Sequence, residues 1–340
     1  MNVARIATIA RLELTQRLRS VGWYVMLGIF AVLLLGITLL SFLVFSGQEQ
    51  SGAGVYSVIV NFVLLLVVLV SPALSGNAIN GDRDAATLAP VQVTMASTGD
   101  IMLGKLLAAV ATGGAFLLVA LPFLLIGMLG GGVSLPMLLV SVAILAVEIV
   151  VVAALGVGLS GLLARPLFSV AATYLVVAAL VVGTLIAFGL GGAAIRTEAV
   201  TYSRPYDEVT GEVICDRWDE YRYEVPRYDY VWWMLAANPF VVLADATPVN
   251  YTSDGYPIDM FGQIKAAVRW AQHPPIEQRW DECRPTMENG PTPQQMVEDS
   301  VPSWFVGLGI QLVLAGGLFA GAWARTRTPA RRLPPGTRIA

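Results

Sequence analysis

The chain has 340 residues, of which 56% are hydrophobic and only 13% are charged, and its formal net charge is −3. Soluble domains carry about 25% charged residues, so this composition excludes an ordinary soluble protein. Charged residues are absent from five tracts, at residues 20–48, 50–81, 106–147, 166–195 and 300–324. Because roughly 20 helical residues cross a hydrocarbon core of about 30 Å, each tract is long enough to span. The sequence therefore predicts an integral membrane protein.

Residues 1–20 precede the first uncharged tract and predict an amphipathic helix. Apolar residues recur there at helical spacing, among them Val3, Ile6, Ala10 and Leu14, and arginines flank this stripe. Such a helix lies on the inner membrane surface with its apolar face buried. The alternative is an ordinary cytoplasmic overhang. We expect no cleaved signal peptide, because the following apolar stretch exceeds the roughly 7–15 residues of such segments.

Six transmembrane helices are predicted, at residues 23–45, 55–75, 104–128, 136–163, 168–191 and 303–324. Three successive glycines from residue 130, followed by Pro136, divide the longest uncharged tract between the third and fourth helices. Arginines gather in residues 1–20 and again in the tail at 325–340 (Arg325, Arg327, Arg331, Arg332 and Arg338). Because basic residues mark the cytoplasmic side, we expect a plasma-membrane protein with both termini in the cytoplasm.

Residues 192–302, between the fifth and sixth predicted helices, form a large insertion on the outer side. They hold 18 of the 24 acidic residues and nine of the 21 basic residues, a net charge of −9. Cys215 and Cys283, the two cysteines of the chain, both lie in this region. Since it faces an oxidising compartment, we expect them to form a disulfide. Tyr221 and Tyr223 alternate with polar residues as in a strand, and a second strand is expected near residues 198–202.

Within this insertion, the run VWWMLAANPFVVLADA at residues 231–246 is apolar but too short to span. Its tryptophans suit a membrane interface, and Asn238-Pro239 is expected to break a helix in the middle. We expect a re-entrant or interfacial hairpin; a core helix of the outer domain is the alternative. The single histidine, His273, and two cysteines do not make a zinc site, so no metal site is expected.

The predicted fold class is therefore an all-α polytopic membrane protein with six transmembrane helices. An N-terminal amphipathic interfacial helix precedes them, and a large α+β extracytoplasmic insertion lies between helices five and six.

Glu148 is the one ionisable residue deep inside a predicted span. A carboxylate at that depth costs a few kcal/mol on insertion scales, so such residues face a bundle interior or a cavity. Glu148 either lines a translocation pathway or packs structurally as a protonated acid bonded to a neighbouring helix. Small residues follow on the same helix and predict close helix packing: Ala154, Gly156, Gly158, Ser160 and Gly161.

The stretch STGDIMLGKLL at residues 97–107 contains Gly99 and then Gly104-Lys105. It matches the phosphate-binding pattern GxxxxGK[ST] except that Leu106 replaces the hydroxyl residue that holds magnesium. A transmembrane helix follows, so the match fails on chemistry and on context, and we expect no ATP site on this chain. Lys105 is instead expected at the inner interface, at the start of the third helix, with its ammonium group extended toward water and lipid headgroups.

The segment from Ser71 to Lys105 has Pro72 near the end of the second helix and the acid–base–acid triplet Asp82-Arg83-Asp84. The pair Thr87-Leu88 follows, and Gly104-Lys105 opens the third helix. In this order the segment resembles permease subunits of ABC-type exporters of the type-2 class. Ala86 replaces the glycine that is usual in this family, and Asp82 stands where glutamate is common. The six spans, the N-terminal helix and the Asn-Pro-Phe at residues 238–240 look like the same class.

The resemblance implies a permease that forms half of a translocation pathway and pairs with a second permease chain, identical or homologous. It implies that ATP and magnesium bind to separate ATPase subunits, so this chain is no enzyme and binds no cofactor of its own. Asp82, Arg83, Asp84, Thr87 and Leu88 would contact the ATPase, on a short charged helix that Pro90 is expected to stop. The other expected partner is membrane lipid; nucleic acid is not expected.

An alternative hypothesis, from another functional class, is that the chain is a membrane-anchored sensor or binding protein whose outer domain is the functional part. It predicts that the loop between the second and third spans is dispensable. An ion- or proton-coupled carrier is disfavoured, because the spans contain one buried carboxylate and no visible internal repeat.

Overall fold

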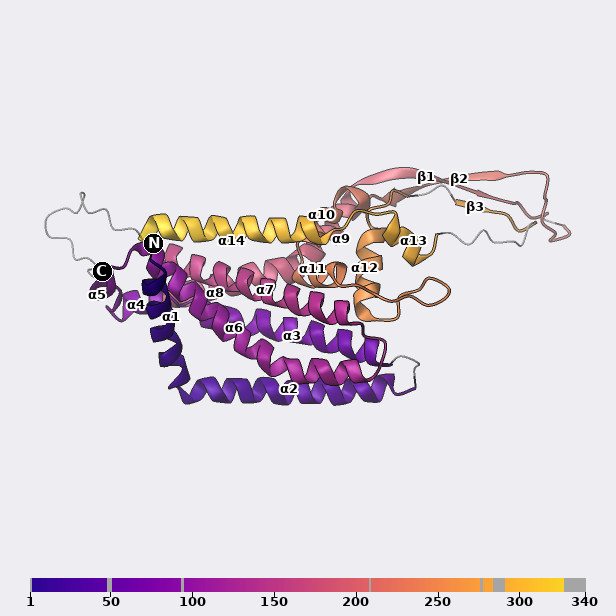
Figure 1. Ribbon diagram of the computed structural model, residues 1–340. Helices are drawn as coiled ribbons and strands as arrows, with labels where there is room; N and C mark the ends of the chain where they lie inside the picture. Colours follow the sequence, from indigo (N-terminus) through magenta and orange to yellow (C-terminus); the bar gives the residue numbers. More distant parts are fainter. Residues whose placement is uncertain are drawn as a thin grey trace.

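The computed structural model describes residues 2–47, 51–92, 95–207, 209–275, 278–283 and 291–326. The chain is mostly helical and includes a small sheet (Figure 1). Most of the predicted basic tail, from residue 327 onward, lies outside the described residues.

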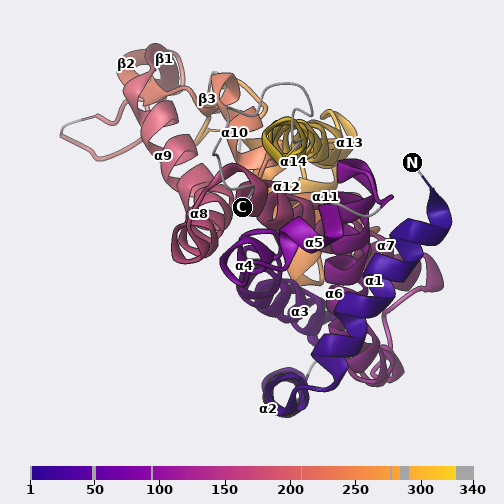
Figure 2. The ribbon, with the colours of Figure 1, turned by 90° about the vertical axis from the view of Figure 1, so that its left-hand side faces the viewer.

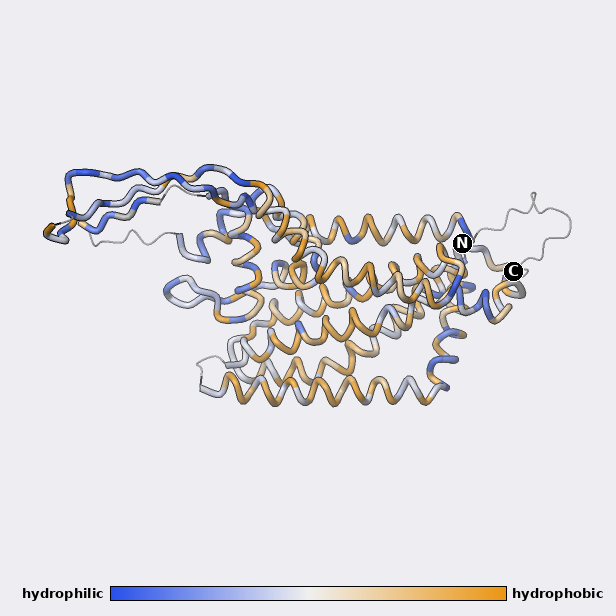
Figure 3. Tube along the Cα trace, turned by 180° about the vertical axis from the view of Figure 1, so that it is seen from behind, coloured by the Kyte–Doolittle hydropathy of each residue, from blue (hydrophilic) through white to orange (hydrophobic). Residues whose placement is uncertain are grey.

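Among the described residues, six helices are long and apolar enough to cross a membrane, as predicted. They are α2 (Val21–Phe45), α3 (Ser51–Ser75) with its extension α4 (Asn80–Asp84), α6 (Thr98–Leu129), α7 (Leu135–Leu162), the continuous α8–η1–α9, and α14 (Trp304–Thr326). The fifth of these consists of α8 (Pro166–Ala178), the π-helical turn η1 (Ala179–Gly183) and α9 (Thr184–Ala194). Apolar residues run along all six, whereas hydrophilic residues gather at the ends and in the sheet (Figure 3).

The core of the bundle forms around α3, which packs against α2, α6, α7 and α8. Tyr56, Ile59 and Leu64 of α3 are fully buried. In contrast, α2 and α8–α9 lie at the periphery when the bundle is viewed along its length (Figure 2). Among the six candidate spans, α2, the fifth span and α14 are the least buried within the described part of the protein.

The most extensive helix contact joins α7 and α14, and the small residues of α7 make it close. A Cβ atom added at Gly158 would lie 3.0 Å from the backbone of Leu318, and one at Gly161 would lie 2.6 Å from the Cβ of Ala322. The predicted role of these small residues in helix packing is confirmed at both positions.

At one end of the bundle lie α1 (Val3–Leu18), α4 and α5 (Leu88–Gln92) (Figure 2). Two expectations about this end are wrong. Pro90 does not stop the charged helix, because it lies inside α5, where the first turn of a helix tolerates proline; the break falls at residues 85–87. The third span begins at Thr98 rather than near Gly104, because Ser97 and Asp100 form a capping box.

The other end carries the segment between the fifth and sixth spans (Figure 1). Strand β1 (Arg196–Ser203) pairs antiparallel with β2 (Asp219–Pro226), which confirms both predicted strands. The short strand β3 (Gln278–Trp280) pairs parallel with β1. Cys215 and Cys283 form the predicted disulfide, with their Cα atoms 5.8 Å apart.

The described residues of this segment also form five short helices: η2 (Tyr228–Tyr230), α10 (Trp232–Ala236), α11 (Pro239–Ala246), α12 (Met260–Trp270) and α13 (Pro293–Glu298). The run at residues 231–246 forms α10 and α11, separated at Asn238. Helix α11 packs against α7 and α14 on one side and α12 on the other. Asn238 caps α11 and also donates from Nδ2 to the carbonyl oxygen of Val181 at 2.7 Å. The run thus joins α12 to the long helices α7 and α14.

Candidate functional site

Lys105 of α6 is the centre of a buried charge cluster. Its side chain is 2% exposed, and its Nζ atom forms ion pairs with Glu13 of α1 and with Asp82 of α4, the latter at 2.6 Å. The expectation that this ammonium group extends toward water and lipid headgroups is therefore wrong. The reason is that Lys105 lies about two turns inside α6, on a face covered by α1 and α4. One cation joins three elements that are separate in sequence.

Gly104 allows α1 to approach α6 at this point. A Cβ atom added at Gly104 would lie 2.7 Å from the Cβ of Ile9 and 3.1 Å from the carbonyl oxygen of Ile6. Contacts this short are not tolerated, so no larger side chain fits unless α1 moves. The Gly104-Lys105 pair that resembles a phosphate loop thus serves helix contact and ion pairing in this fold.

The first turn of α1 is bound to the start of α6. Asp100 is 1% exposed, and its Oδ1 atom accepts a hydrogen bond from the backbone nitrogen of Asn2 at 2.9 Å. Its Oδ2 atom accepts from the nitrogen of Ser97 at 3.0 Å, which completes the cap of α6. The guanidinium of Arg5 donates to the carbonyl oxygen of Met95. One carboxylate therefore both begins the third span and holds the N-terminal helix.

The last turn of α1 is bound to α3 and α6 through Arg17. Its guanidinium donates to the carbonyl oxygen of Leu74 at 2.9 Å and to Oγ1 of Thr112 at 3.1 Å. Leu74 lies in the last turn of α3, where a cation is favoured by the helix dipole. Burial lowers the pKa of Arg17, and the nearby carboxylate of Glu13 partly opposes this effect. Arg17 thus contacts two spans from α1.

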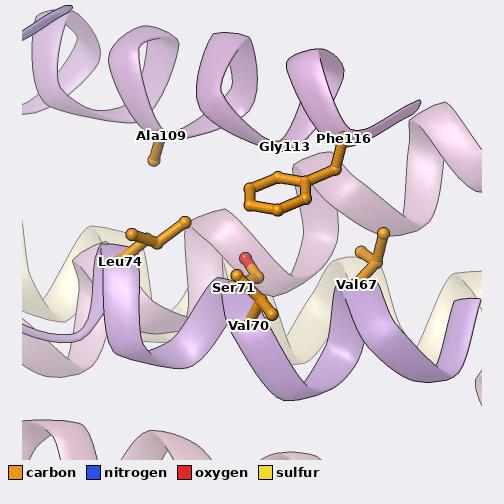
Figure 4. Close-up of a pocket in the computed structure, with 7 residues that line it drawn as sticks. All are labelled: Val67, Val70, Ser71, Leu74, Ala109, Gly113 and Phe116. Atoms are coloured by element: carbon orange, nitrogen blue, oxygen red, sulfur yellow. The ribbon is translucent and has the colours of Figure 1, made fainter. Parts of the chain in front are cut away.

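A cavity of about 10 Å³, enough for one water molecule, lies between the same two spans (Figure 4). Val67, Val70, Ser71 and Leu74 of α3 face Ala109, Gly113 and Phe116 of α6 across it. Pro72, which follows Ser71 inside α3, removes one backbone donor from this part of the helix. The interface between the second and third spans is therefore not completely filled near the charge cluster.

The start of α4 is bound to the fourth and fifth spans. Oγ of Ser160 in α7 accepts from the backbone nitrogens of Ile79 and Asn80, at 2.9 and 3.0 Å. The buried amide of Asn80 donates to Oγ of Ser169 in α8. Arg83 donates to the carbonyl oxygen of Leu163, at the end of α7, and to the amide oxygen of Asn80. The start of α4 is thus hydrogen-bonded to α7 and to α8.

The five residues expected to contact an ATPase divide into two groups. Asp82, Arg83 and Leu88 face the bundle: Leu88 is 2% exposed and packs with Ile79 and Met102. Asp84 and Thr87 are exposed, and the hydroxyl of Thr87 donates to the carbonyl oxygen of Asp82. A partner that approached this end of the bundle would therefore meet Asp84 and Thr87.

Between α4 and α5, Ala86 has a φ of 58°, and it is the one non-glycine residue with positive φ in the described part of the chain. This left-handed conformation favours glycine and is rare for residues with a side chain. Ala86 thus forms the tight turn at the cost of backbone strain.

Glu148 lies far from this cluster, in the interface between α7 and α14. It is fully buried, and neither of its carboxyl oxygens has a hydrogen-bond partner among the described residues. Gln311 of α14 interacts with it, and the amide oxygen of Gln311 also lacks a partner there. Glu148 therefore packs between two helices of its own chain.

The sequence did not point to Glu13 or Asp100 as part of the site. Glu13 is the single acidic residue of α1, in a helix that carries several arginines, and this isolated charge was the available signal. Asp100 follows Ser97 by three residues, the spacing of a capping box. In the part of the chain that the structure describes, no group of three metal-ligating side chains is found.

No protein-family model matches this chain, and no curated protein matches it.

Proposed function

We propose that the chain is the permease subunit of an ATP-driven exporter, with ATP bound and hydrolysed on a separate subunit. The observation that carries the proposal is the cluster around Lys105. There the loop between the second and third spans and the N-terminal helix form ion pairs with the buried ammonium group of Lys105 in α6. A force applied to this loop would reach α1, α6 and, through Ser160 and Arg83, α7.

In this proposal, Asp84 and Thr87 form the surface that meets the ATPase, while Asp82, Arg83 and Leu88 transmit its movement to the spans. The resemblance of Asp82-Arg83-Asp84 and Thr87-Leu88 to the coupling loop of type-2 permeases supports this assignment. The pathway itself would form between this chain and a second permease chain. The loop would lie on the cytoplasmic side, as would both termini.

A photoreactive residue placed at position 84 tests the proposal. The full chain is purified from its native membrane after irradiation, and cross-linked proteins are identified by mass spectrometry. We expect a cross-link to a subunit with a nucleotide-binding sequence, and vanadate-sensitive ATP hydrolysis in the purified complex. The matched control carries the same group at Thr210, which is exposed at the opposite end of the protein.

Two results would overturn the proposal. One is a purified complex without an ATP-hydrolysing subunit. The other is equal cross-linking of that subunit from positions 84 and 210. A dispensable inner loop, with function retained in loop variants, would instead favour a membrane-anchored binding protein.

A further inference from the structure

A cavity in the segment between the fifth and sixth candidate spans lies between α9, η2, α12 and α13. Its volume is about 590 Å³, within the range of roughly 300–1,000 Å³ that is typical of small-molecule sites. Its walls include Phe188 of α9, Tyr228 of η2, Ala267 and Trp270 of α12, and Met296 of α13. Nothing in the proposed function uses this cavity.

The chemistry of the walls selects an apolar ligand. None of the described residues that line the cavity carries a charge; they are alanine, glycine, proline, leucine, methionine and aromatic residues. This contrasts with the net charge of −9 on the surrounding residues 192–302. Transfer of a charged or strongly polar ligand into such walls would leave its polar groups without partners. An aliphatic chain, in contrast, would gain from the burial of its methylene groups.

The position of the cavity indicates that such an aliphatic chain belongs to a membrane lipid. Phe188 lies six residues before Ala194, the end of the fifth span, which is about 9 Å along the helix axis. The cavity therefore extends from the outer segment to the depth of the outer lipid leaflet. Large exposed aromatic residues surround this level: Trp270 is 58% exposed, Tyr230 56% and Trp233 46%. Such residues are enriched where protein meets the membrane interface.

We infer that this cavity binds one acyl chain of a membrane lipid, which enters along α9 from the outer leaflet. The acyl chain lies between α9 and α12, and the headgroup of the lipid lies at the rim of the cavity near Trp270. The site is independent of any ATPase, so its test does not depend on the proposed function.

The experiment uses the full chain in nanodiscs of phosphatidylethanolamine and phosphatidylglycerol. A trace of phosphatidylethanolamine carries a photoreactive diazirine at the end of one acyl chain. After irradiation and proteolysis, mass spectrometry maps the adducts. We expect adducts on α12 and α13, which lie outside the six spans, as well as on lipid-facing α2.

Ala267→Trp fills part of the cavity, and because Ala267 is exposed on the helix surface the substitution should leave the core intact. Losing room for about two methylene groups weakens binding by about tenfold. We therefore expect about tenfold fewer adducts on α12 and α13, with those on α2 unchanged. The matched control is Gln263→Trp, one turn earlier on the exposed surface of the same helix and not among the lining residues. It should leave the labelling as in the wild type.

Both variants are first shown to keep the Cys215–Cys283 disulfide and the thermal midpoint of the wild type. Absence of adducts on α12 and α13, or equal labelling of both variants, would overturn the inference. A photoreactive fatty acid added to the same nanodiscs forms a second arm. Labelling by the fatty acid without labelling by the phospholipid would also overturn the assignment to a membrane lipid.

Discussion

The Nζ atom of Lys105 lies 2.6 Å from Oδ2 of Asp82, so the third candidate span is held by an ion pair to the loop that precedes it. The same ammonium group binds Glu13 of the N-terminal helix. Two carboxylates and one cation are thus held together where the side chain of Lys105 is almost completely buried.

Lys105→Met should destabilise the protein, because it leaves Glu13 and Asp82 facing each other without a cation. Removing one partner of a buried ion pair costs about 3–5 kcal/mol. We expect the lower end of this range, since the side chain of Asp82 is 33% exposed. The thermal midpoint of the detergent-purified chain measures the effect. The triple variant Glu13→Gln, Asp82→Asn, Lys105→Met should recover most of the loss; an unchanged midpoint in Lys105→Met would contradict the prediction.

Gly104→Ala should loosen α1 from α6. The added methyl group overlaps Ile9, and overpacking costs about 1–3 kcal/mol, against a gain of about 1 kcal/mol in helix propensity. The rate of tryptic cleavage after Arg11 reports the release of α1 and should rise.

Two further variants make the test of Gly104 specific. Gly104→Ala combined with Ile9→Ala should restore the slow cleavage, because the smaller side chain makes room. Gly114→Ala, on the same helix, has no atom within 4 Å of the added Cβ and should leave cleavage slow. Faster cleavage in Gly114→Ala would show that the effect is not local.

Ala86→Gly should stabilise the turn between α4 and α5. An L-residue in the left-handed region costs roughly 1–2 kcal/mol, and glycine removes this cost. The greater conformational freedom of glycine in the unfolded chain offsets about 0.4–1 kcal/mol of that stabilisation. We therefore expect an increase of about 0.5 kcal/mol in the free energy of unfolding. Ala85→Gly is the control, because Ala85 has a φ of −75° and glycine should be destabilising there. The prediction is wrong if both variants shift stability in the same direction.

Glu148→Gln should keep or raise stability. The amide of the new side chain can donate to the unpartnered oxygen of Gln311, and a net hydrogen bond contributes about 1 kcal/mol. Glu148→Ala should lower the thermal midpoint, because it leaves a cavity between α7 and α14. A large loss of stability in Glu148→Gln would mean that the carboxyl group itself is required.

Asp259→Asn should change how stability depends on pH. Asp259 caps α12 through a hydrogen bond of 2.7 Å from the nitrogen of Gly262, and burial raises its pKa. Because the folded-state pKa lies above the ordinary value, the stability that Asp259 contributes is fully present below that ordinary value. It is lost as the pH rises through the folded-state pKa.

Asparagine keeps the cap and has no charge to bury, so Asp259→Asn should exceed the wild type in stability at neutral pH. The difference should shrink as the pH falls toward about 4, as measured by thermal midpoints of the full chain. A constant difference across this range would contradict the prediction.

The pattern of apolar residues was sufficient to predict the helices. A helix that faces lipid or other helices has no water to satisfy its backbone, so uncharged tracts of this length leave few alternatives. Local sequence also predicted two strands, one near Tyr221, where tyrosines alternate with polar residues, and one at residues 198–202. The Cys215–Cys283 disulfide was predictable because both cysteines lie in the same segment. The position of Lys105 was not, because a lysine near the end of an apolar tract ordinarily extends its amine to the membrane surface.

The sequence by itself determined that six apolar helices exist and that a segment rich in acidic residues, with both cysteines, separates the last two. These properties depend on how apolar each segment is over its own length. Only the tertiary structure decided that Glu13, Asp82 and Lys105 form one cluster, that Gly104 makes room for Ile9, and that an apolar cavity lies beside α9. Each of these depends on contacts between segments distant along the chain, and burial of a charge is favourable only where its partner is already in place.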